Sequence, residues 1–265
     1  MPEPSSASPE SSEQLPPELA RHGRTIDLLG REGFERLRSA LVVIVGLGGV
    51  GGHAAVALAR AGVGRLRLVD FDQVTLSSLN RSAFATPAEV GEPKVQVLLR
   101  FLERIDSAIS VDPMQAFFHT ETAEAILSGQ PDFVVDAIDS LNPKVALLQT
   151  CVERSLRVVS CMGASARTDP LALRVGDLHD TRVCPLARVV RKKLGRLGIT
   201  RGIPTVYSVE RGRAPLPPDT GDETLQRGRI RRRLPSLGIL PGIFGYTAAG
   251  VVIAALSGAG AKKQQ

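Results

Sequence analysis

The chain has 265 residues, of which 43% are hydrophobic and only three are cysteine. A chain of this length can bury enough apolar surface in one core to fold without disulfides or a structural metal. No two of the cysteines form a Cys-x-x-Cys pair, which argues against a disulfide scaffold and a zinc knuckle. This composition predicts a reducing compartment, and we expect the protein to be cytoplasmic.

The positive charge is concentrated in the last third of the chain. The formal net charge is +6; residues 1–175 contain 17 Lys and Arg against 21 Asp and Glu, and residues 176–265 contain 16 against 6. Such segregation is typical of a surface that binds a polyanion such as nucleic acid, because phosphate neutralisation releases counterions. A solvated basic face would have the same composition and stays an alternative.

The composition also predicts the domain organisation. Residues 1–20 contain five prolines, four glutamates and no Lys or Arg, so we expect a disordered tail without the features of a secretory signal or a mitochondrial presequence. A single domain is expected over residues 21–257, with a basic, partly flexible segment at about 182–235. Residues 258–265 are expected to be a C-terminal tail.

One run, residues 239–256, is about as long as a membrane span. Pro241, Gly242, Gly245 and Gly250 interrupt the run. These interruptions favour a buried core helix, and we expect no membrane partner.

The strongest motif begins at residue 40. Residues 40–45 (Ala-Leu-Val-Val-Ile-Val) form an apolar run typical of a strand buried on both faces, and Gly46-Leu47-Gly48-Gly49-Val50-Gly51-Gly52 follows it directly. Residues 53–61 predict a helix, and residues 66–70 predict a second strand that ends in Asp70. A strand, a glycine turn, a helix and a strand ending in an acid form the mononucleotide-binding half of a doubly wound fold.

Each part of this motif has a physical task. Gly46 allows the tight turn, Gly48 lets backbone N–H groups approach a phosphate, and Gly51 lets the helix and the strand pack closely. Gly49 belongs to the same turn, and Asp70 is positioned to accept the hydroxyls of a ribose. A glycine turn that serves packing alone is the alternative.

Further helices and strands alternate after this motif. We predict a helix at residues 94–104, a strand at 109–114, a strand at 133–136, a helix at 143–154 and a strand at 157–161. This alternation predicts an α/β fold with a doubly wound, mainly parallel sheet, a Rossmann-like domain that the basic C-terminal region extends. Ligands of such sheets bind at the carboxyl ends of the strands, where Asp70 and Asp139 are expected.

The residues that follow Asp70 indicate which nucleotide is bound. Arg81 and Lys94 can hold the oxygens of a triphosphate, the first as a bidentate fork and the second as a point charge. Asp139 can hold Mg²⁺ against those oxygens. A nicotinamide-dependent oxidoreductase has no need of the two cations, so ATP and Mg²⁺ are the expected cofactors.

These motifs resemble the adenylating domain that ubiquitin-activating-type enzymes share with the activators of thiamine and molybdopterin sulfur carriers. Within that superfamily, the chain most resembles the tRNA threonylcarbamoyladenosine dehydratases. The closer resemblance rests on Arg21-His22-Gly23-Arg24-Thr25, on Val135-Asp136-Ala137-Ile138-Asp139-Ser140 with Pro143-Lys144, on Asp169-Pro170 and on Val175-Gly176-Asp177-Leu178.

The resemblance implies a reaction and a set of site residues. ATP would activate the threonyl carboxylate of a modified adenosine beside the tRNA anticodon, and the ring would then close with loss of water. The implied catalytic residues are Arg81, Lys94 and Asp139, with Asp139 as the Mg²⁺ ligand. The other implied nucleotide-binding residues are Gly46, Gly48, Gly49, Gly51, Asp70, Asp72, Asn80 and Arg24.

The resemblance also implies a homodimer, in which an arginine near the start of the domain reaches the nucleotide of the partner subunit. Arg24 fits one version of that motif and Arg21 fits the other, and a surface arginine without such a role is the alternative. Ser78 and Ser82 stand where relatives usually have Asn and Gln, which leaves a non-catalytic nucleotide-sensing protein open.

The cysteines bear on a second hypothesis, an adenylating activator of a ubiquitin-like or sulfur-carrier protein. Cys184 lies in a linker-like stretch between Arg182 and Arg188, where positive charge can activate a thiol. We favour an incidental thiol there, and a core position for Cys161 at the end of a predicted strand. A sulfur-relay protein partner stays open, and the four histidines show no metal-ligand spacing.

Two basic clusters are candidates for binding tRNA. The first contains Arg188, Arg191, Lys192, Lys193 and Arg196, and the second contains Arg227, Arg229, Arg231, Arg232 and Arg233. The chain has two Tyr, eight Phe and no Trp. Because base stacking requires aromatic side chains, we expect contacts with the RNA backbone to dominate.

Overall fold

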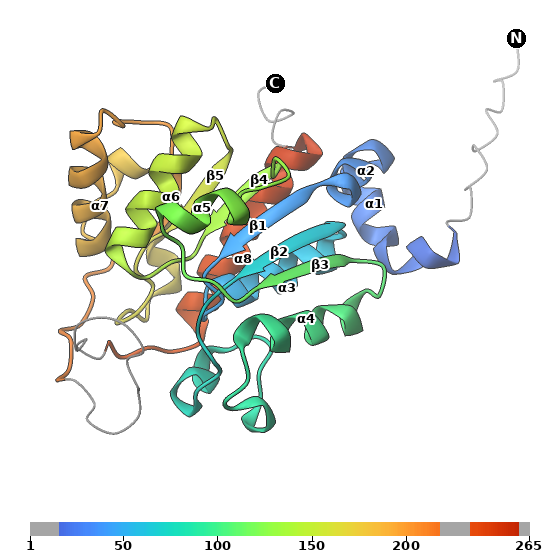
Figure 1. Ribbon diagram of the computed structural model, residues 1–265, viewed down its shortest axis with the longest axis horizontal. Coiled ribbons are helices and arrows are strands. Elements are labelled where there is room, and N and C mark those ends of the chain that lie inside the picture. Colours follow the sequence, from blue (N-terminus) through green and yellow to red (C-terminus); the bar gives the residue numbers. More distant parts are fainter. Residues whose placement is uncertain (1–15, 218–233, 260–265) are drawn as a thin grey trace, which may run out of the picture.

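The computed structural model describes residues 16–217 and 234–259. Within them, a seven-stranded sheet has the strand order β3-β2-β1-β4-β5-β7-β6, in which every neighbouring pair is parallel except β7 and β6 (Figure 1). The strands are β1 (Leu41–Val45), β2 (Arg65–Val69), β3 (Ser110–Met114), β4 (Phe133–Asp136), β5 (Val158–Cys161), β6 (Leu173–Asp177) and β7 (Pro204–Ser208). The predicted doubly wound, mainly parallel sheet is confirmed.

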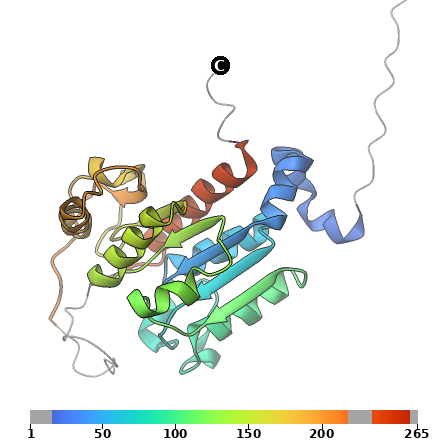
Figure 2. The ribbon, with the colours of Figure 1, turned by 45° about the horizontal axis from the view of Figure 1, so that its top comes forward.

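Helices cover both faces of the sheet (Figures 1 and 2). The core on one face contains side chains of α3 (Gly51–Ala61), α4 (Lys94–Ile105) and α8 (Ile239–Ser257). The core on the other face contains side chains of α5 (Thr120–Ile126), α6 (Leu141–Glu153) and α7 (Pro185–Arg196). Ahead of β1, α1 (Gly23–Leu29) and α2 (Arg31–Ser39) pack on each other, and α2 also contacts α8.

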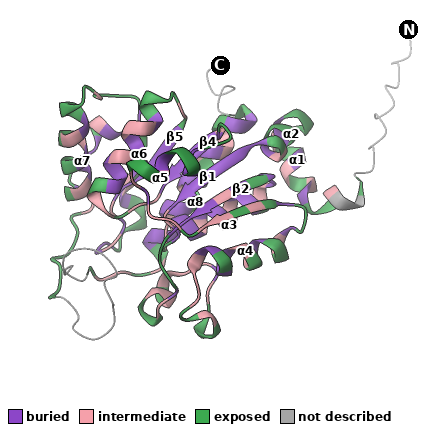
Figure 3. Cartoon of the chain, in the orientation of Figure 1, coloured by how far each residue is buried: buried purple, intermediate pink, exposed green. Residues whose placement is uncertain are grey.

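The central strand β1 shows why the two cores form. All five of its residues are buried, and the central strands form the most buried part of the molecule (Figure 3). Val42 and Ile44 enter one core, whereas Val43 and Val45 enter the other. Alternate side chains of a strand point to opposite faces, so a continuous apolar run is what a sheet with helices on both sides requires.

The predicted elements of the first 161 residues are found within two residues of their expected limits, but no range was predicted for α1, α2, α5, β6 or β7. Part of the basic segment forms α7, because Ala187, Val190 and Leu194 recur at helical spacing and are buried. A 3₁₀ helix over Pro17–His22 begins inside the segment predicted as a tail. The second basic cluster, Arg227 to Arg233, lies outside the described residues, as do residues 1–15 and 260–265.

The last helix, α8, is long and apolar enough to cross a membrane by length and composition. In the structure it packs along α3, and Leu240, Phe244, Ala248 and Val252 are buried in the core. A Cβ atom on Gly245 would lie 2.3 Å from a backbone oxygen of the segment leading into α3, so glycine permits this close packing. The prediction of a buried core helix is confirmed.

Asp106, at the end of α4, fixes the N-terminal helices to the sheet. Its carboxylate accepts hydrogen bonds from Arg38 at 3.0 Å and from the backbone N–H of Ala108 at 3.0 Å, and it pairs with Arg21 at 3.4 Å and with His22 at 3.2 Å. Burial alone would raise the pKa of this carboxyl group, but the bonds from Ala108, His22 and Arg38 outweigh burial and lower the pKa below 3.8.

We predict that Asp106→Asn lowers the free energy of unfolding at pH 7 by about 2 kcal/mol, because it removes a buried carboxylate that accepts hydrogen bonds from Arg38 and from the backbone N–H of Ala108. The folded-state pKa is depressed, so this contribution is present above about pH 3.8 and is lost as the pH falls further. Urea unfolding at a series of pH values should therefore show the two proteins converging in acid. The matched control is Asp112→Asn, which breaks the pair with Arg67 at a side chain that is 52% exposed and should cost less than about 1 kcal/mol.

Candidate functional site

The turn between β1 and α3 is built from contacts that exclude side chains. Gly46 has a φ of 91°, and a Cβ atom on it would lie 2.8 Å from the carbonyl oxygen of Ala137. A Cβ atom on Gly51 would lie 1.8 Å from the carbonyl oxygen of Gly46. A Cβ atom on Gly48 would meet nothing within 4 Å. Gly46 and Gly51 are thus required by packing, whereas Gly48 borders open space that a ligand can fill.

Gly49 lies beneath side chains from two distant segments. A Cβ atom on Gly49 would lie 2.9 Å from Pro241 in the first turn of α8 and 3.1 Å from Cγ of Arg81. His53 Nδ1 lies 2.7 Å from the carbonyl oxygen of Gly49, so His53 holds the turn against the first turn of α3. The spacing of the histidines predicted no role for His53, and its position just after the glycine turn is the signal that could have indicated this contact.

Asp70, at the carboxyl end of β2, joins the glycine turn to the loop that follows it. Its Oδ2 accepts the N–H of Leu47 at 2.6 Å, and its Oδ1 accepts the N–H of Asp72 at 2.8 Å. The residue is only 7% exposed, and burial raises the pKa of the Asp70 carboxyl group although Lys94 acts in the opposite direction. Each carboxylate oxygen has a second lone pair, so the group can still accept a ligand hydroxyl.

Lys94, the first residue of α4, brings a positive charge into this acidic group. Its Nζ donates to Asp72 at 2.9 Å, and its side chain is only 12% exposed. Burial lowers the pKa of the ammonium group, but the carboxylates of Asp70, Asp72 and Asp139 outweigh burial and raise it above 10.5. Lys94 therefore remains charged at neutral pH, as a phosphate ligand must.

The segment over Leu76–Arg81 supplies a second cation. Arg81 Nη1 donates to the carbonyl oxygen of Ser77 at 2.7 Å and to Oδ1 of Asn80 at 3.0 Å. The amide of Asn80 in turn donates to the carbonyl oxygen of Ser236 at 2.9 Å, just before α8. These bonds fix the side chain of Arg81, whose Cβ and Cγ lie over Gly49 and which lines the pocket.

Ser78 and Ser82, the two departures from the expected pattern, have structural partners. The hydroxyl of Ser78 donates to the carbonyl oxygen of Thr75 at 2.7 Å, and the hydroxyl of Ser82 accepts the N–H of Ala85 at 3.0 Å. Both serines line the pocket that the preceding residues surround. The lining residues are Leu47, Gly48, Gly49, Val74, Ser78, Arg81, Ser82, Phe84 and Lys94.

Among the predicted site residues, the structure brings the glycine turn, Arg81 and Lys94 together around one pocket and puts Asp70 and Asp72 beside it. Asp139 lies exposed at the carboxyl end of β4, where it accepts a hydrogen bond from Ser140 at 3.1 Å. Arg24 is distant, because Figure 1 shows α1 and α2 at the amino end of β1, away from the turn.

A buried ion pair supports the turn from below. Nζ of Lys144 lies 2.6 Å from Oδ2 of Asp136, and both side chains are 0% exposed. Ser160 donates to the same carboxylate oxygen at 2.6 Å, and Oδ1 accepts the N–H of Ile138 at 3.1 Å. These bonds fix the backbone after β4, on which Gly46 packs. This role of Lys144 was not predicted, since nothing in the spacing of the sequence indicates that Lys144 is buried.

Burial explains the state of the cysteines. It raises the pKa of Cys161 to about 12 and that of Cys151 to about 12, so neither thiol forms a nucleophilic thiolate at neutral pH. The core position predicted for Cys161 is confirmed. Cys184 precedes the first turn of α7 and is also buried, instead of lying in an open linker.

The carboxylates at this site fit Mg²⁺ only if a bound ligand supplies further oxygen atoms. In the described part of the chain, no group of three His, Cys, Asp or Glu side chains could hold a metal ion. Mg²⁺ in nucleotide sites takes one or two carboxylates and completes its octahedron with phosphate oxygens and water. The exposed carboxylate of Asp139, at the same edge of the sheet as the glycine turn, is compatible with that arrangement.

The model of the ThiF family matches residues 20–265. The chain belongs to the ThiF family. It is 42% identical to tRNA threonylcarbamoyladenosine dehydratase 2 of Saccharomyces cerevisiae over 84% of this chain, but it spans only 53% of that relative. It is 38% identical to the tRNA threonylcarbamoyladenosine dehydratase of Bacillus subtilis over 69% of this chain and 72% of the relative.

A solved structure agrees with these relatives. The Escherichia coli tRNA N6-threonylcarbamoyladenosine dehydratase TcdA, in complex with ATP, superposes with a TM-score of 0.81 at 28% identity. The match covers 92% of this chain and 97% of the E. coli chain. The resemblance to this group of dehydratases and the adenylating-domain fold, both predicted from sequence, are confirmed.

The glycine turn allows stability and ligand binding to be tested separately. We predict that Gly51→Ala costs about 3 kcal/mol of unfolding free energy, because the new Cβ overlaps a backbone oxygen that cannot move without disrupting the turn. Gly48→Ala should unfold like the wild type but weaken ATP binding by about tenfold, or about 1.4 kcal/mol, because its Cβ enters the open space. Thermal unfolding and calorimetric titration with ATP measure the two effects; equal melting temperatures for both variants would contradict the packing argument.

Proposed function

We propose that this protein uses ATP to dehydrate N6-threonylcarbamoyladenosine in tRNA to its cyclic form. The observation that carries the proposal is the pocket in which the glycine turn, Arg81 and Lys94 converge. The names of the relatives support the choice of substrate, and the E. coli complex supports ATP as the cosubstrate.

Each group of site residues binds a different part of the nucleotide. Backbone N–H groups of the turn and the N-terminus of α3 face the phosphates, where the helix dipole favours negative charge. Arg81 and Lys94 bind phosphate oxygens and stabilise the charge that develops on them, while Asp70 accepts the ribose hydroxyls. Asp72 keeps Lys94 oriented and Asn80 does the same for Arg81. Mg²⁺, held by Asp139, would neutralise phosphate charge when bound.

The reaction requires little further chemistry from the protein. A carboxylate oxygen is a poor leaving group, so the threonyl carboxylate attacks the α-phosphate of ATP and releases pyrophosphate. A nitrogen of the same modified group then attacks the acyl carbon and gives up its proton to solvent, and AMP leaves with the carboxylate oxygen, so the nucleoside loses the elements of one water. Because the attack is intramolecular, its effective concentration is high and no protein nucleophile is needed.

A homodimer completes this proposal. Arg21 is already bonded to the carbonyl oxygen of Ile105 at 2.8 Å and pairs with Asp106. Arg24 is exposed on α1 and makes no ion pair or side-chain hydrogen bond with any described residue. Of the two candidates, Arg24 is therefore the one that reaches the nucleotide of a partner subunit. The thiols described above suit a reducing compartment, in keeping with a cytoplasmic enzyme.

Arg81 provides the direct test of the reaction. We expect Arg81→Ala to lower kcat by about 10²–10³-fold, because a charge that stabilises the transition state is lost. Purified protein is incubated with ATP, Mg²⁺ and threonylcarbamoylated tRNA, and the digested nucleosides are examined by mass spectrometry for a product lighter by one water.

The matched control is Arg100→Ala, an exposed arginine on α4 that pairs with Glu92 and should retain wild-type turnover. Unchanged melting temperatures exclude a folding defect in either variant. The proposal fails if the wild type makes no dehydrated nucleoside, or if Arg81→Ala makes it at the wild-type rate.

Cys184 distinguishes dehydration from the activation of a carrier protein. Its burial gives no support to a thiol that must reach another protein. We expect Cys184→Ser to retain both ATP-dependent adenylation and formation of the cyclic nucleoside. A variant that still adenylates but no longer turns over would favour the activator instead.

A further inference from the structure

Helix α7 carries a row of cations on its outer face. Arg188, Lys192 and Arg196 are exposed and follow one another at intervals of four residues. They span about 12 Å along the helix axis at 1.5 Å per residue. None of the three forms an ion pair or a side-chain hydrogen bond with a described residue, and α7 itself contains no Asp or Glu. We refer to Arg188, Lys192 and Arg196 as the α7 stripe.

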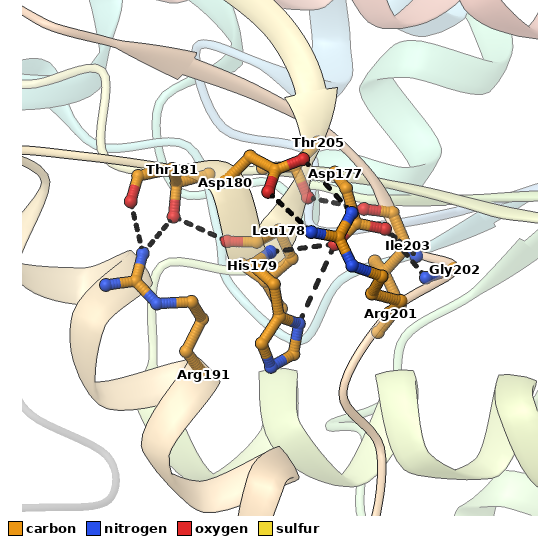
Figure 4. A network of polar contacts seen from close by, with 10 residues as sticks. All are labelled: Asp177, Leu178, His179, Asp180, Thr181, Arg191, Arg201, Gly202, Ile203 and Thr205. Carbon is orange, nitrogen blue, oxygen red and sulfur yellow. Dashed lines mark hydrogen bonds and ion pairs between the residues drawn. The ribbon is translucent and has the colours of Figure 1, made fainter.

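The other two cations of α7 anchor the helix. Arg191 donates to the carbonyl oxygen and to the hydroxyl of Thr181, and the Thr181 hydroxyl donates to the carbonyl oxygen of Leu178 at 2.6 Å (Figure 4). Lys193 donates to Oδ1 of Asn142 at 2.8 Å. These bonds, together with the buried apolar face of α7, fix the direction in which the α7 stripe points.

The neighbouring segment is held in the same way. Arg201 pairs with Asp180 at 3.1 Å, and Asp177 accepts the backbone N–H of Gly202 at 2.7 Å (Figure 4). One network of hydrogen bonds and ion pairs therefore joins the end of β6, the short helix after it and the start of β7, beneath α7. The α7 stripe projects from a rigid support.

The bond from Lys193 also locates α7 relative to the nucleotide site. Asn142 lies in the first turn of α6, three residues after Asp139 in the sequence. The start of α6 is at the carboxyl end of β4, the same edge of the sheet that carries the glycine turn. The α7 stripe thus borders the edge at which the proposed reaction takes place.

We propose that the α7 stripe binds the phosphate backbone of the RNA whose nucleotide enters this edge. The inference rests on the proposed function, and it assigns the RNA to one face of the molecule. Like charges at i and i+4 destabilise a helix, and a polyanion offsets this cost while releasing counterions. Because α7 has no aromatic residue, the contact is with the backbone and not with stacked bases.

The test replaces all three residues of the α7 stripe by Gln, which keeps helix propensity and removes the charge. Binding of an unmodified tRNA transcript is measured by filter binding over a series of KCl concentrations. The Kd should rise on the order of tenfold, and the slope of log Kd against log salt should fall by about 2. ATP affinity should not change.

The matched control removes the same charge elsewhere, by Arg31→Gln, Arg60→Gln and Arg104→Gln together. These exposed arginines lie on α2, α3 and α4, away from the carboxyl edge. A control that weakens tRNA binding as much as the α7 triple variant overturns the proposal, since bulk charge alone would then explain the effect. Wild-type affinity and slope in the α7 variant also overturn it, which is the outcome expected if the stripe binds an acidic protein.

This experiment separates the two proposals. If the wild type yields cyclic nucleoside but the α7 variant binds tRNA unchanged, only the assignment of the RNA surface fails. If the slope of log Kd for tRNA against log salt falls in the α7 variant, the assignment of the RNA surface is supported whether or not the wild type dehydrates modified tRNA.

Discussion

Close contact between three pieces of backbone is the constraint on which the site depends. Gly46 packs on Ala137, and Gly51 packs on Gly46, at distances that leave no room for a Cβ atom. The turn after β1, the start of α3 and the loop after β4 are thereby fixed relative to one another. The polar groups of the site can converge because the glycines allow their supporting segments to meet.

The site contains two ion pairs that differ in burial and therefore in role. Asp136 and Lys144 are fully buried, and their partners Ser160 and Ile138 complete a network that leaves no position for a ligand. Asp72 and Lys94 are partly exposed beside the pocket, so a phosphate can compete for the ammonium group. The first pair positions the backbone and the second supplies a charge for binding.

The sheet also separates the two binding tasks. The turn after β1, the segment that follows β2 and the first residue of α4 line the pocket proposed for the nucleotide. Helix α7 packs on α6 and on the 3₁₀ helix Leu178–Asp180, and it presents its cations beside the same edge. The pocket and α7 both lie at the carboxyl edge of the sheet, so in the proposed reaction one sheet would hold ATP and orient the RNA.

The sequence by itself determined strands β1 to β5, helices α3, α4 and α6 and the glycine turn, because local apolar runs and glycine spacing report directly on strands and turns. It did not reveal β6, whose exposed residues lack a strand pattern and whose pairing with β7 joins distant segments. Tertiary structure alone decided that Lys144 and Cys184 are buried, that His53 holds Gly49, and which cations of α7 face solvent. Those outcomes depend on contacts between residues far apart in the chain, and such contacts leave no periodic signal in the sequence.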